Sequence, residues 1–368
     1  MDRRKFVKTA GLAGTAGLLA ACGRQGAPGD CGDGSRGGSA ETFEWKMVTT
    51  WPRDFPGLGT GASYLAKIIG EMSDGRLTVK VYGGGELVPA FEVFDTVQRG
   101  TAEMGHGAAY YWKGKIPAAV FFTGAPFTFI SSEINGWLYH AGGLEVYQEV
   151  YAPFGLIPFP VGNSGTQTGG WFNKEIRSVA DLQGLKMRIP GIGGEVLQRV
   201  GGTPVSIPGS EVFTALQSGT VDAAEWVGPM NDLAQGLFRA AKYYYYPGWQ
   251  EPGSVLEGLV NAEAWAELPP DLQAIVKYAC QAANQDMYAD FEARNGDALQ
   301  TLVEKHGVEL REFPRDVLAE LKRVTFEILE EQAAADPLSA RVWASQKAFL
   351  QQVRGWTRIG AQSMVEHR

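Results

Sequence analysis

Two charged residues lie where strands would end and could bind a charged ligand. Arg188 belongs to the run Lys186-Met187-Arg188-Ile189-Pro190, which is typical of a strand that stops at a Pro-Gly turn near a cleft. Its planar guanidinium suits two-point binding of a carboxylate. Glu225 follows the small residues Ala223 and Ala224, and a buried acid there would need a partner such as a cation or Arg188. A surface ion pair for Arg188 and an exposed strand end for Glu225 are the alternative interpretations.

Neutral polar and aromatic residues accompany these two charges elsewhere in the chain. Asn163 and Gln167 lie in Gly162-Asn163-Ser164-Gly165-Thr166-Gln167 and offer amide oxygens and donors, although such a segment is also typical of a turn. Glu251 is an acid beside an aromatic residue in Trp249-Gln250-Glu251-Pro252. Three aromatic residues follow one another at Tyr110, Tyr111 and Trp112. They would belong either to the hydrophobic core or to the walls of a cleft.

The motifs of common enzyme classes are broken or missing in this sequence. Gly191-Ile192-Gly193-Gly194-Glu195-Val196 begins like a dinucleotide-binding loop but has Val at the sixth position. Gly114-Lys115 lacks the spacing of a phosphate-binding loop, and no GxSxG nucleophile motif is present. We therefore predict no catalytic residue and no organic cofactor.

Composition supports a globular protein with a negative charge. The 368 residues suggest about two domains, and 33 Lys and Arg against 41 Asp and Glu give a net charge of -8. Binding to nucleic acid normally needs a basic face, which this balance disfavours. Beyond the N-terminus no uncharged run reaches the length of about 18 residues that a membrane helix requires.

The N-terminus is predicted to be an export signal followed by a tether. Arg3-Arg4-Lys5 precedes an apolar stretch that is too short to span a membrane, the layout of a twin-arginine signal. Leu19-Ala20-Ala21-Cys22 resembles a lipobox, in which Cys22 would be lipidated, and an incidental cysteine is the alternative. Residues 23–41 are rich in Gly and Ser, as in a flexible linker. Cys31 and Cys280 could pair in the oxidising periplasm, but we favour two free thiols.

The folded body divides into a glycine-punctuated α/β part and a helical part. Strands are predicted at 43–48 and 77–81, and helices at 62–72 and 91–98, which implies a mostly parallel sheet. After residue 261 the pattern predicts helices over 269–306, 315–335 and 338–365, with a short edge strand at 308–310. An apolar stripe in the last helix packs either on its own body or on a partner and comprises Phe349, Val353 and Trp356.

An internal repeat supports two similar lobes. Residues 81–105 align without a gap on residues 200–224, with nine identities in 25 positions. The offset of 119 residues is too long for a solenoid and fits two α/β units, although repeated use of a common helix–turn unit is the alternative. Two lobes would leave a cleft, and ligands favour domain interfaces and the carboxyl ends of parallel strands.

Several ordered motifs resemble the solute-binding subunits of tripartite ATP-independent periplasmic (TRAP) transporters, of the DctP type. The similarity extends from about residue 43 to the late helices, and the segments that carry it are Gly169-Gly170-Trp171-Phe172, Leu185 to Gly191, Ala215 to Asp222 and Ala241-Lys242-Tyr243-Tyr244-Tyr245. Three further segments resemble the branch that binds 2-oxo and 2-hydroxy monocarboxylates with a cation: Gly162 to Gln167, Glu225-Trp226-Val227-Gly228-Pro229 and Trp249 to Pro252.

This resemblance implies an α/β fold of the two-lobed periplasmic-binding-protein type, with a hinge, a long lobe-spanning helix and a helical C-terminal segment. The implied divisions are a signal at 1–22, a tether at 23–41, lobe I at 42–160, lobe II at 161–260 and spanning and C-terminal helices at 261–368. It implies Arg188 as the carboxylate clamp. The positions that match ligands of Na⁺ or Ca²⁺ in this branch are Gln167, Glu225, the Trp226 carbonyl and Glu251. Such an all-oxygen set suits a hard cation.

The implied function is capture of a small organic acid, such as pyruvate or lactate, and its delivery to membrane permease subunits. Tyr110, Tyr111 and Phe127 would wall off the alkyl end, and Asn163 would contact the ligand. In some members of this branch the last helix is exchanged in a dimer, which would cover the apolar stripe. The alternatives are an exported enzyme acting on a small carboxylic acid, with Glu225 or Glu251 as a base, and a lipid-anchored module that binds a protein through its late helices.

Overall fold

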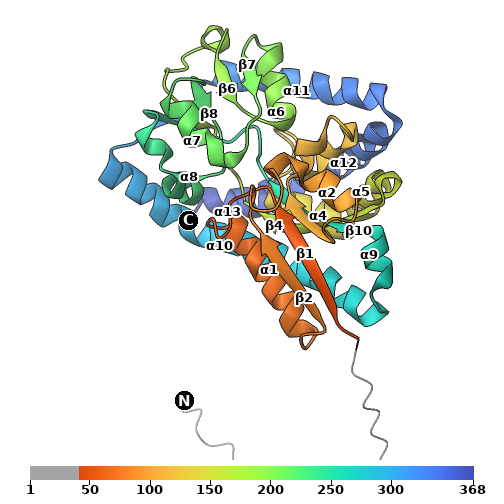
Figure 1. The fold of residues 1–368 in the computed structure, drawn as a ribbon. Helices are drawn as coiled ribbons and strands as arrows, with labels where there is room; N and C mark the ends of the chain where they lie inside the picture. Colours follow the sequence, from red (N-terminus) through yellow and green to blue (C-terminus); the bar gives the residue numbers. More distant parts are fainter. Residues whose placement is uncertain (1–40) are drawn as a thin grey trace, which may run out of the picture. The chain divides into compact units, whose positions relative to one another are not determined.

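The computed structural model describes residues 41–368 and contains two separate β-sheets (Figure 1). The export signal, the lipobox, Cys31 and all of the tether except residue 41 therefore lie outside the described residues. The first sheet has the order β2-β1-β3-β10-β4, with bounds Leu77–Tyr82, Phe43–Thr49, Met104–Gly107, Val255–Asn261 and Leu156–Asn163. The second has the order β11-β9-β5-β8-β6-β7, with bounds Glu309–Glu312, Tyr243–Tyr246, Gly170–Phe172, Ala223–Ala224, Lys186–Arg188 and Thr203–Val205.

Helices surround both sheets and dominate the last hundred residues. The helices of the α/β part are α1 Leu58–Met72, α2 Val93–Gln98, α3 Val120–Thr123, α4 Ser131–His140, α5 Gly143–Tyr151, α6 Gly191–Arg199, α7 Gly209–Gln217, α8 Pro229–Gln235 and α9 Ala262–Glu267. The later ones are α10 Pro270–His306, α11 Arg315–Ala335, α12 Pro337–Thr357 and α13 Ser363–Glu366. The predicted helix over 315–335 and the break at Asp336-Pro337 are confirmed.

The two sheets are built from the same five-element unit. The segments β1-α1-β2-α2-β3 and β6-α6-β7-α7-β8 both place their first strand between the other two, with parallel pairing. Each sheet also contains one strand, β10 or β5, that runs antiparallel to both of its neighbours. Both sheets are therefore mixed: the strands of the repeated units pair in parallel, as the prediction of a mostly parallel sheet expected, and each sheet also contains one reversed strand.

The sequence repeat marks the second half of this unit. Helical residues 90–98 and 209–217 correspond at the offset of 119, as do the starts of β3 and β8. Gly100 and Gly219 end the two helices with φ of 69° and 73°, a left-handed conformation that favours glycine. The first aligned residues differ, because Val81 lies in β2 whereas Val200 follows the end of α6. The repeat therefore places β3 and β8, and the loops after them, in equivalent positions.

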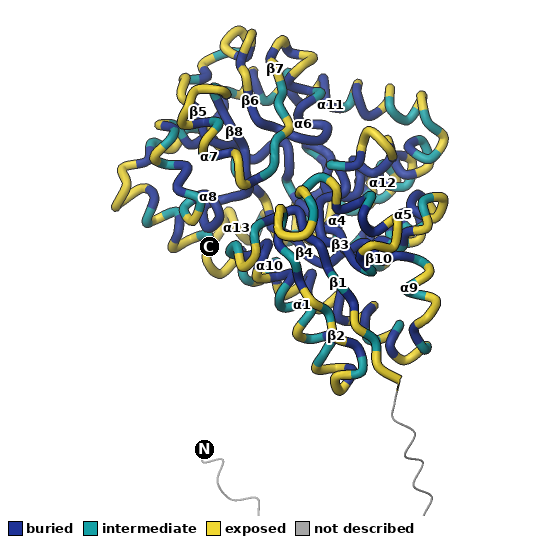
Figure 2. The backbone as a smooth tube through the Cα atoms, viewed as in Figure 1, coloured by how far each residue is buried: buried dark blue, intermediate teal, exposed yellow. Residues whose placement is uncertain are grey.

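The long helices connect the two halves. The 37-residue helix α10 packs against α1 and β4 beside the first sheet and against α8 beside the second, as the resemblance implied. The helix α11 packs on α6, and α12 packs on α4 and α5. Buried residues form one large core that extends through both halves and a smaller one between the first sheet and α1 and α10 (Figure 2).

The predicted last helix is interrupted. The α-helix ends at Thr357, and a π-helical turn, Arg358–Gln362, precedes α13. The apolar stripe is split, because Phe349 packs on Phe129 and Val353 packs on the core, whereas Trp356 is 69% exposed. No helix of residues 41–368 combines the length and hydropathy needed to cross a membrane. Cys280 is buried in α10 and has no disulfide partner within the same residues.

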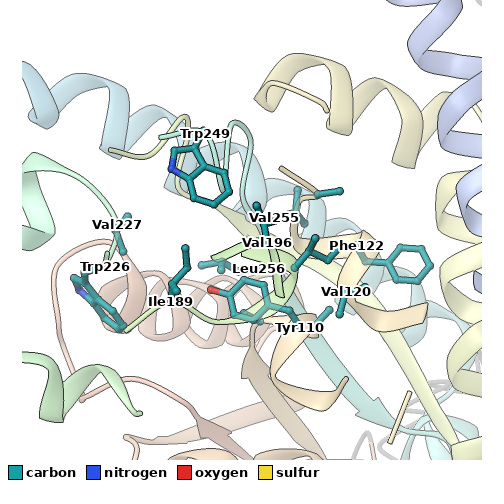
Figure 3. Close-up of a cluster of buried hydrophobic side chains, with 14 of the residues drawn as sticks. Tyr110, Val120, Phe122, Ile189, Val196, Trp226, Val227, Trp249, Val255 and Leu256 are labelled. Carbon is teal, nitrogen blue, oxygen red and sulfur yellow. The ribbon is translucent and has the colours of Figure 1, made fainter. Parts of the chain in front are cut away.

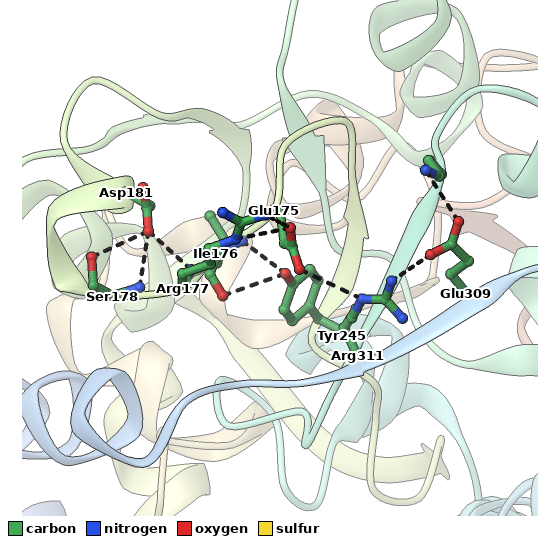
Figure 4. Close-up of polar contacts among 9 residues, drawn as sticks. Glu175, Ile176, Arg177, Ser178, Asp181, Tyr245, Glu309 and Arg311 are labelled. Carbon is green, nitrogen blue, oxygen red and sulfur yellow. Dashed lines mark hydrogen bonds and ion pairs between the residues drawn. The ribbon is translucent and has the colours of Figure 1, made fainter.

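A partly buried polar network lies at the edge of the second sheet. The Ile176 amide donates to the Tyr245 hydroxyl at 2.7 Å, and Arg311 pairs with Glu309 of β11 (Figure 4). The Arg311 guanidinium also lies 3.9 Å from Glu175, which connects the 175–181 loop to β11. Ion pairs that remain open to solvent contribute little stability each, so this network mainly positions the loop.

A buried acid in β10 anchors the loop after β3. Glu257 accepts hydrogen bonds from the Trp112 indole and, at 2.5 Å, from the Tyr147 hydroxyl. Burial raises the pKa of Glu257 to about 7. The folded state therefore holds this proton more tightly than the unfolded state does, and the stability that the group contributes is lost as the pH rises from about 4.5 through 7.

We expect Glu257→Gln to remove this pH dependence. Relative to the wild type, the unfolding free energy of the variant should increase by up to about 3 kcal/mol between pH 4.5 and pH 8. Urea denaturation at both pH values measures the difference. A difference that stays constant with pH would show that Glu257 does not titrate in this range.

Candidate functional site

A buried ion pair joins the two charged residues singled out in the sequence. The Arg188 guanidinium pairs with the Glu225 carboxylate, and the two side chains are 1% and 0% exposed. Arg188 also donates to the Glu225 backbone carbonyl at 3.1 Å, and its guanidinium lies 5.1 Å from the centre of the Trp226 ring. Neither residue is at the surface, so both surface interpretations are wrong.

Strand topology explains why these residues meet. Arg188 is the last residue of β6 and pairs with Ala224, the last residue of β8. The Glu225 amide then donates to the Arg188 carbonyl at 3.1 Å. The carboxyl ends of two adjacent parallel strands thus bring both side chains to the same edge, where the strand order reverses.

A second buried pair comes from two loops. Gln167 donates through Nε2 to Glu251 at 2.8 Å, and the Ser254 hydroxyl donates to the same carboxylate oxygen at 2.5 Å. The Gln167 backbone amide donates to the Glu251 carbonyl at 3.1 Å. These contacts fix the segment after β4 against the segment before β10, so the amide and the acid are held as one unit.

Aromatic residues from the first half face these polar groups. Tyr110, in the short helix η2 Ala109–Trp112 after β3, packs against Gly191, whose φ of 65° lets the chain turn into α6. Burial, followed by the nearby charge of Glu251, raises the pKa of the Tyr110 hydroxyl. Arg188 approaches the Tyr111 hydroxyl at 3.5 Å. Figure 3 shows Tyr110 with its hydroxyl on the side of Ile189 and Trp226.

Asn163 and Phe127 lie on neighbouring segments. The Asn163 Oδ1 atom accepts from the Ser131 hydroxyl and from the Gly165 amide, both at 2.9 Å, which leaves its Nδ2 group without a partner in the described chain. The Phe127 ring stacks on Trp249 with centroids 5.8 Å apart, and its amide donates to the Trp249 carbonyl. Phe127 thus packs on the loop that carries Glu251.

The electrostatics of the site favour an additional positive charge. Burial raises the pKa of Glu225 to about 8, although the Arg188 guanidinium acts in the opposite direction. Burial likewise raises the pKa of Glu251. If both acids are ionised, a single guanidinium has to balance two buried carboxylates. Burying this excess negative charge costs free energy unless a further cation is present.

Two buried oxygen atoms of these residues have no hydrogen-bond partner in the described part of the chain. They are the Gln167 Oε1 and Glu225 Oε2 atoms. Residues 41–368 contain no group of three or more His, Cys, Asp and Glu arranged as metal ligands. A site here would therefore consist of two carboxylates with amide and carbonyl oxygens, as in the predicted set, and the donor chemistry fits a hard cation.

A cavity opens beside the aromatic residues. It has a volume of about 190 Å³ and lies between η2 and the segments around β6, α6 and β7. Lys113 of the first half and Glu195 of α6 line it and form an ion pair at 3.1 Å. The cavity therefore borders the predicted site where the two halves meet.

Three supporting residues were not found from the sequence. Ser131 and Ser254 orient Asn163 and Glu251, and the buried acid Asp232 lies behind the Glu225 loop. Single serines carry no pattern that would identify them. Asp232 could have been noticed as an acid in the first turn of a helix that begins at Pro229.

Comparisons with known proteins identify the family of the chain. The family model described as "bacterial extracellular solute-binding protein, family 7" matches residues 47–336. A protein of Nostoc sp. named "monocarboxylate 2-oxoacid-binding periplasmic protein" is 42% identical over 361 residues, which cover 98% of this chain and 96% of that protein.

Solved structures are similar to this chain in both fold and sequence. A TRAP periplasmic solute-binding protein from Colwellia psychrerythraea, with bound calcium and pyruvate, has a TM-score of 0.87 and 43% identity, covering 89% of this chain and 100% of that one. A second, from Pseudoalteromonas atlantica with sodium and pyruvate, has a TM-score of 0.86 and 43% identity over 89% and 99% of the chains. A third, from Bordetella bronchiseptica, is a mixed-occupancy dimer with calcium and picolinate. It has a TM-score of 0.87 and 36% identity, covering 89% of this chain and 97% of that one.

Proposed function

The chain belongs to family 7 of the bacterial extracellular solute-binding proteins, and we propose that it captures a 2-oxo monocarboxylate such as pyruvate together with Ca²⁺ or Na⁺. It would deliver this acid to the permease of a TRAP transporter. The observation that carries the proposal is the buried Arg188–Glu225 pair, whose loop is hydrogen-bonded to the segment of Gln167, together with one buried unpaired oxygen on Glu225 and one on Gln167.

The charges of the site match this ligand pair. When both acids are ionised, they and the single arginine give one net negative charge in a buried place. A monocarboxylate would add another, so its binding there is unfavourable unless a cation enters with it. A bound cation supplies the positive charge that attracts the carboxylate and the 2-oxo oxygen of the acid. Ca²⁺ would neutralise the assembly fully, and Na⁺ would do so if one of the acids is protonated.

Each predicted site residue then has a role that its geometry allows. Arg188 would bind the carboxylate of the acid, and Asn163 would donate through its unused Nδ2 group. The aromatic wall around the alkyl end would consist of Tyr110, Tyr111 and Phe127. The oxygens that would hold the cation are those of Gln167, Glu225, Glu251 and the Trp226 carbonyl.

Closure of the two halves would trap the acid. Contacts between the halves already exist and include those from Lys113 to Glu195 and from Arg188 to Tyr111. A ligand that touches both halves binds the closed arrangement more tightly and shifts the population toward it. The closed form would be the one recognised by the permease.

Location and assembly are part of the same proposal. The twin-arginine pattern Arg3-Arg4 supports export of the folded protein, and the lipobox supports an anchor at Cys22. Exposed apolar residues at the C-terminus support a homodimer through the last helix: Trp356, Ile359, Met364 and Val365.

Ligand-dependent stability tests the proposed function. Pyruvate and Ca²⁺ together should raise the thermal midpoint far more than either alone, because each is proposed to bind tightly only when the other is present. A ligand at 100 times its Kd stabilises the folded protein by about 2.7 kcal/mol. Differential scanning fluorimetry with and without a chelator measures the effect, and NMR follows the pyruvate. An equal shift in the presence of the chelator would contradict the cation's role, and steady conversion of pyruvate would favour an exported enzyme.

A further inference from the structure

A buried carboxylate lies directly behind the loop that carries Glu225 and Trp226. Asp232 is in the first turn of α8 and is 0% exposed. Its Oδ2 atom accepts from the Trp171 indole at 2.9 Å and from the Tyr244 hydroxyl at 2.7 Å. The Trp171 and Tyr244 rings stack on each other, with their centroids 4.1 Å apart. One acid thus connects α8 to β5 and β9 in the interior of the second sheet.

The other oxygen of this carboxylate reaches the loop itself. Asp232 Oδ1 accepts from the Val227 amide at 3.4 Å, and the Asp232 amide donates back to the Gly228 carbonyl at 2.9 Å. On the far side of Val227, its carbonyl accepts from the Thr168 amide at 3.1 Å. The peptide planes before and after Val227 are therefore both held, one by Asp232 and one by the neighbour of Gln167.

Peptide geometry makes the first of these contacts important. The Val227 N–H and the Trp226 C=O belong to the same trans peptide unit, in which they point in opposite directions. Because the N–H points at Asp232, the Trp226 oxygen points away from it. Within residues 41–368 this oxygen accepts no hydrogen bond, so it is free to bind a cation.

We propose that Asp232 is a positioning residue that orients and polarises the Trp226–Val227 peptide, so that the Trp226 carbonyl oxygen binds the cation. An ionised acceptor on the N–H side strengthens the peptide dipole and makes the carbonyl oxygen more negative. Groups that hold a metal ligand in place in this way typically change metal affinity 10- to 100-fold when they are replaced. The inference rests on the cation site of the proposed function.

Calcium titration of variants, with the metal alone and no organic acid, tests the inference. Asp232→Asn should lower the Ca²⁺ affinity 10- to 100-fold. The matched control is Glu257→Gln, because Glu257 is also a buried acid that accepts from a Trp indole and a Tyr hydroxyl. Tyr244→Phe removes one bond to Asp232 but leaves the Val227 contact. Both controls should stay within about threefold of the wild type.

A labelled wild-type protein gives a measurement that does not depend on the variant folding. Trp226-Val227 is the only Trp-Val pair in the sequence, so ¹³C-carbonyl Trp with ¹⁵N-Val yields one carbonyl–amide correlation in NMR. Ca²⁺ should shift its carbonyl carbon, and in Asp232→Asn the Val227 amide should move even without metal.

Three results would overturn the inference while the proposed function stands. These are a wild-type carbonyl that does not respond to saturating Ca²⁺, an Asp232→Asn variant that binds Ca²⁺ like the wild type, and an equal loss of affinity in all three variants. If the wild type binds no cation at all, the proposed function itself fails, and the inference fails with it.

Discussion

Replacing Arg188 by alanine is expected to weaken pyruvate binding by about 2–5 kcal/mol, which is a loss of about 30-fold to 4,000-fold in affinity. Arg188 is the one cationic side chain paired with the buried acids of the site, and it is 1% exposed. Without it, the carboxylate of the acid would enter a buried place that contains two acids and no guanidinium. Isothermal titration calorimetry of pyruvate in saturating Ca²⁺ measures the loss.

Two further variants separate the clamp from general effects. Arg188→Lys keeps the charge but lacks the planar fork, so it should recover only part of the affinity. Arg199→Ala removes an exposed arginine that pairs with Glu331 and should leave the affinity unchanged. Because Arg188→Ala also leaves Glu225 buried without its partner, circular dichroism must show that the variant is folded. An unchanged pyruvate affinity in a folded Arg188→Ala protein would refute the clamp.

Glu225→Gln is expected to weaken the binding of cation and acid together. The change keeps the shape of the side chain but removes a carboxylate whose second oxygen is buried and unpaired. We expect Ca²⁺ affinity to fall at least about 100-fold, because an ionised oxygen ligand of a hard cation is replaced by a neutral one. Because the proposed function couples the binding of the cation to that of the acid, pyruvate affinity at the same Ca²⁺ concentration should fall as well.

Metal content after dialysis, measured by mass spectrometry, and calorimetry of pyruvate test this expectation. Because burial raises the pKa of Glu225 to about 8, a cation that binds its carboxylate would compete with a proton below that pH. Wild-type Ca²⁺ affinity should therefore rise as the pH rises toward 8, and the Glu225→Gln variant should lose this component. Glu257→Gln serves as the control for replacing a buried acid. Retained calcium in purified Glu225→Gln would exclude Glu225 as a ligand.

The two variants have different signatures. Arg188→Ala removes a contact to the acid and leaves all the oxygens proposed for the cation, so Ca²⁺ should still bind to it in the absence of pyruvate. Glu225→Gln removes a group proposed to hold the cation and should weaken Ca²⁺ even without pyruvate. If the two variants lost Ca²⁺ affinity equally, the result would point to collapse of the site rather than to separate roles of Arg188 and Glu225.

Local patterns in the chain were sufficient for much of the fold. Apolar periodicity and helix-breaking residues predicted α10 and α11, since Pro270 starts one helix and Asp336-Pro337 ends the other. The repeat predicted two related units, and the structure shows the same strand order in both. Such features depend on neighbours in sequence, on the φ angle of proline and on the tolerance of glycine for left-handed backbone, and they can therefore be recognised without coordinates.

Burial and pairing at the site depended on contacts between distant segments. Arg188 and Glu225 were each compatible with a surface position until adjacent strands β6 and β8 placed them side by side, 37 residues apart in sequence. The late apolar stripe likewise divided, with Phe349 packed on Phe129 and Trp356 exposed. Asp232 gained its role only because β5 and β9 bring Trp171 and Tyr244 to it. Residue types and spacing thus identified the chemistry available to this protein. The strand order decided which of the charged groups are buried side by side, and a buried charge requires an opposite charge next to it.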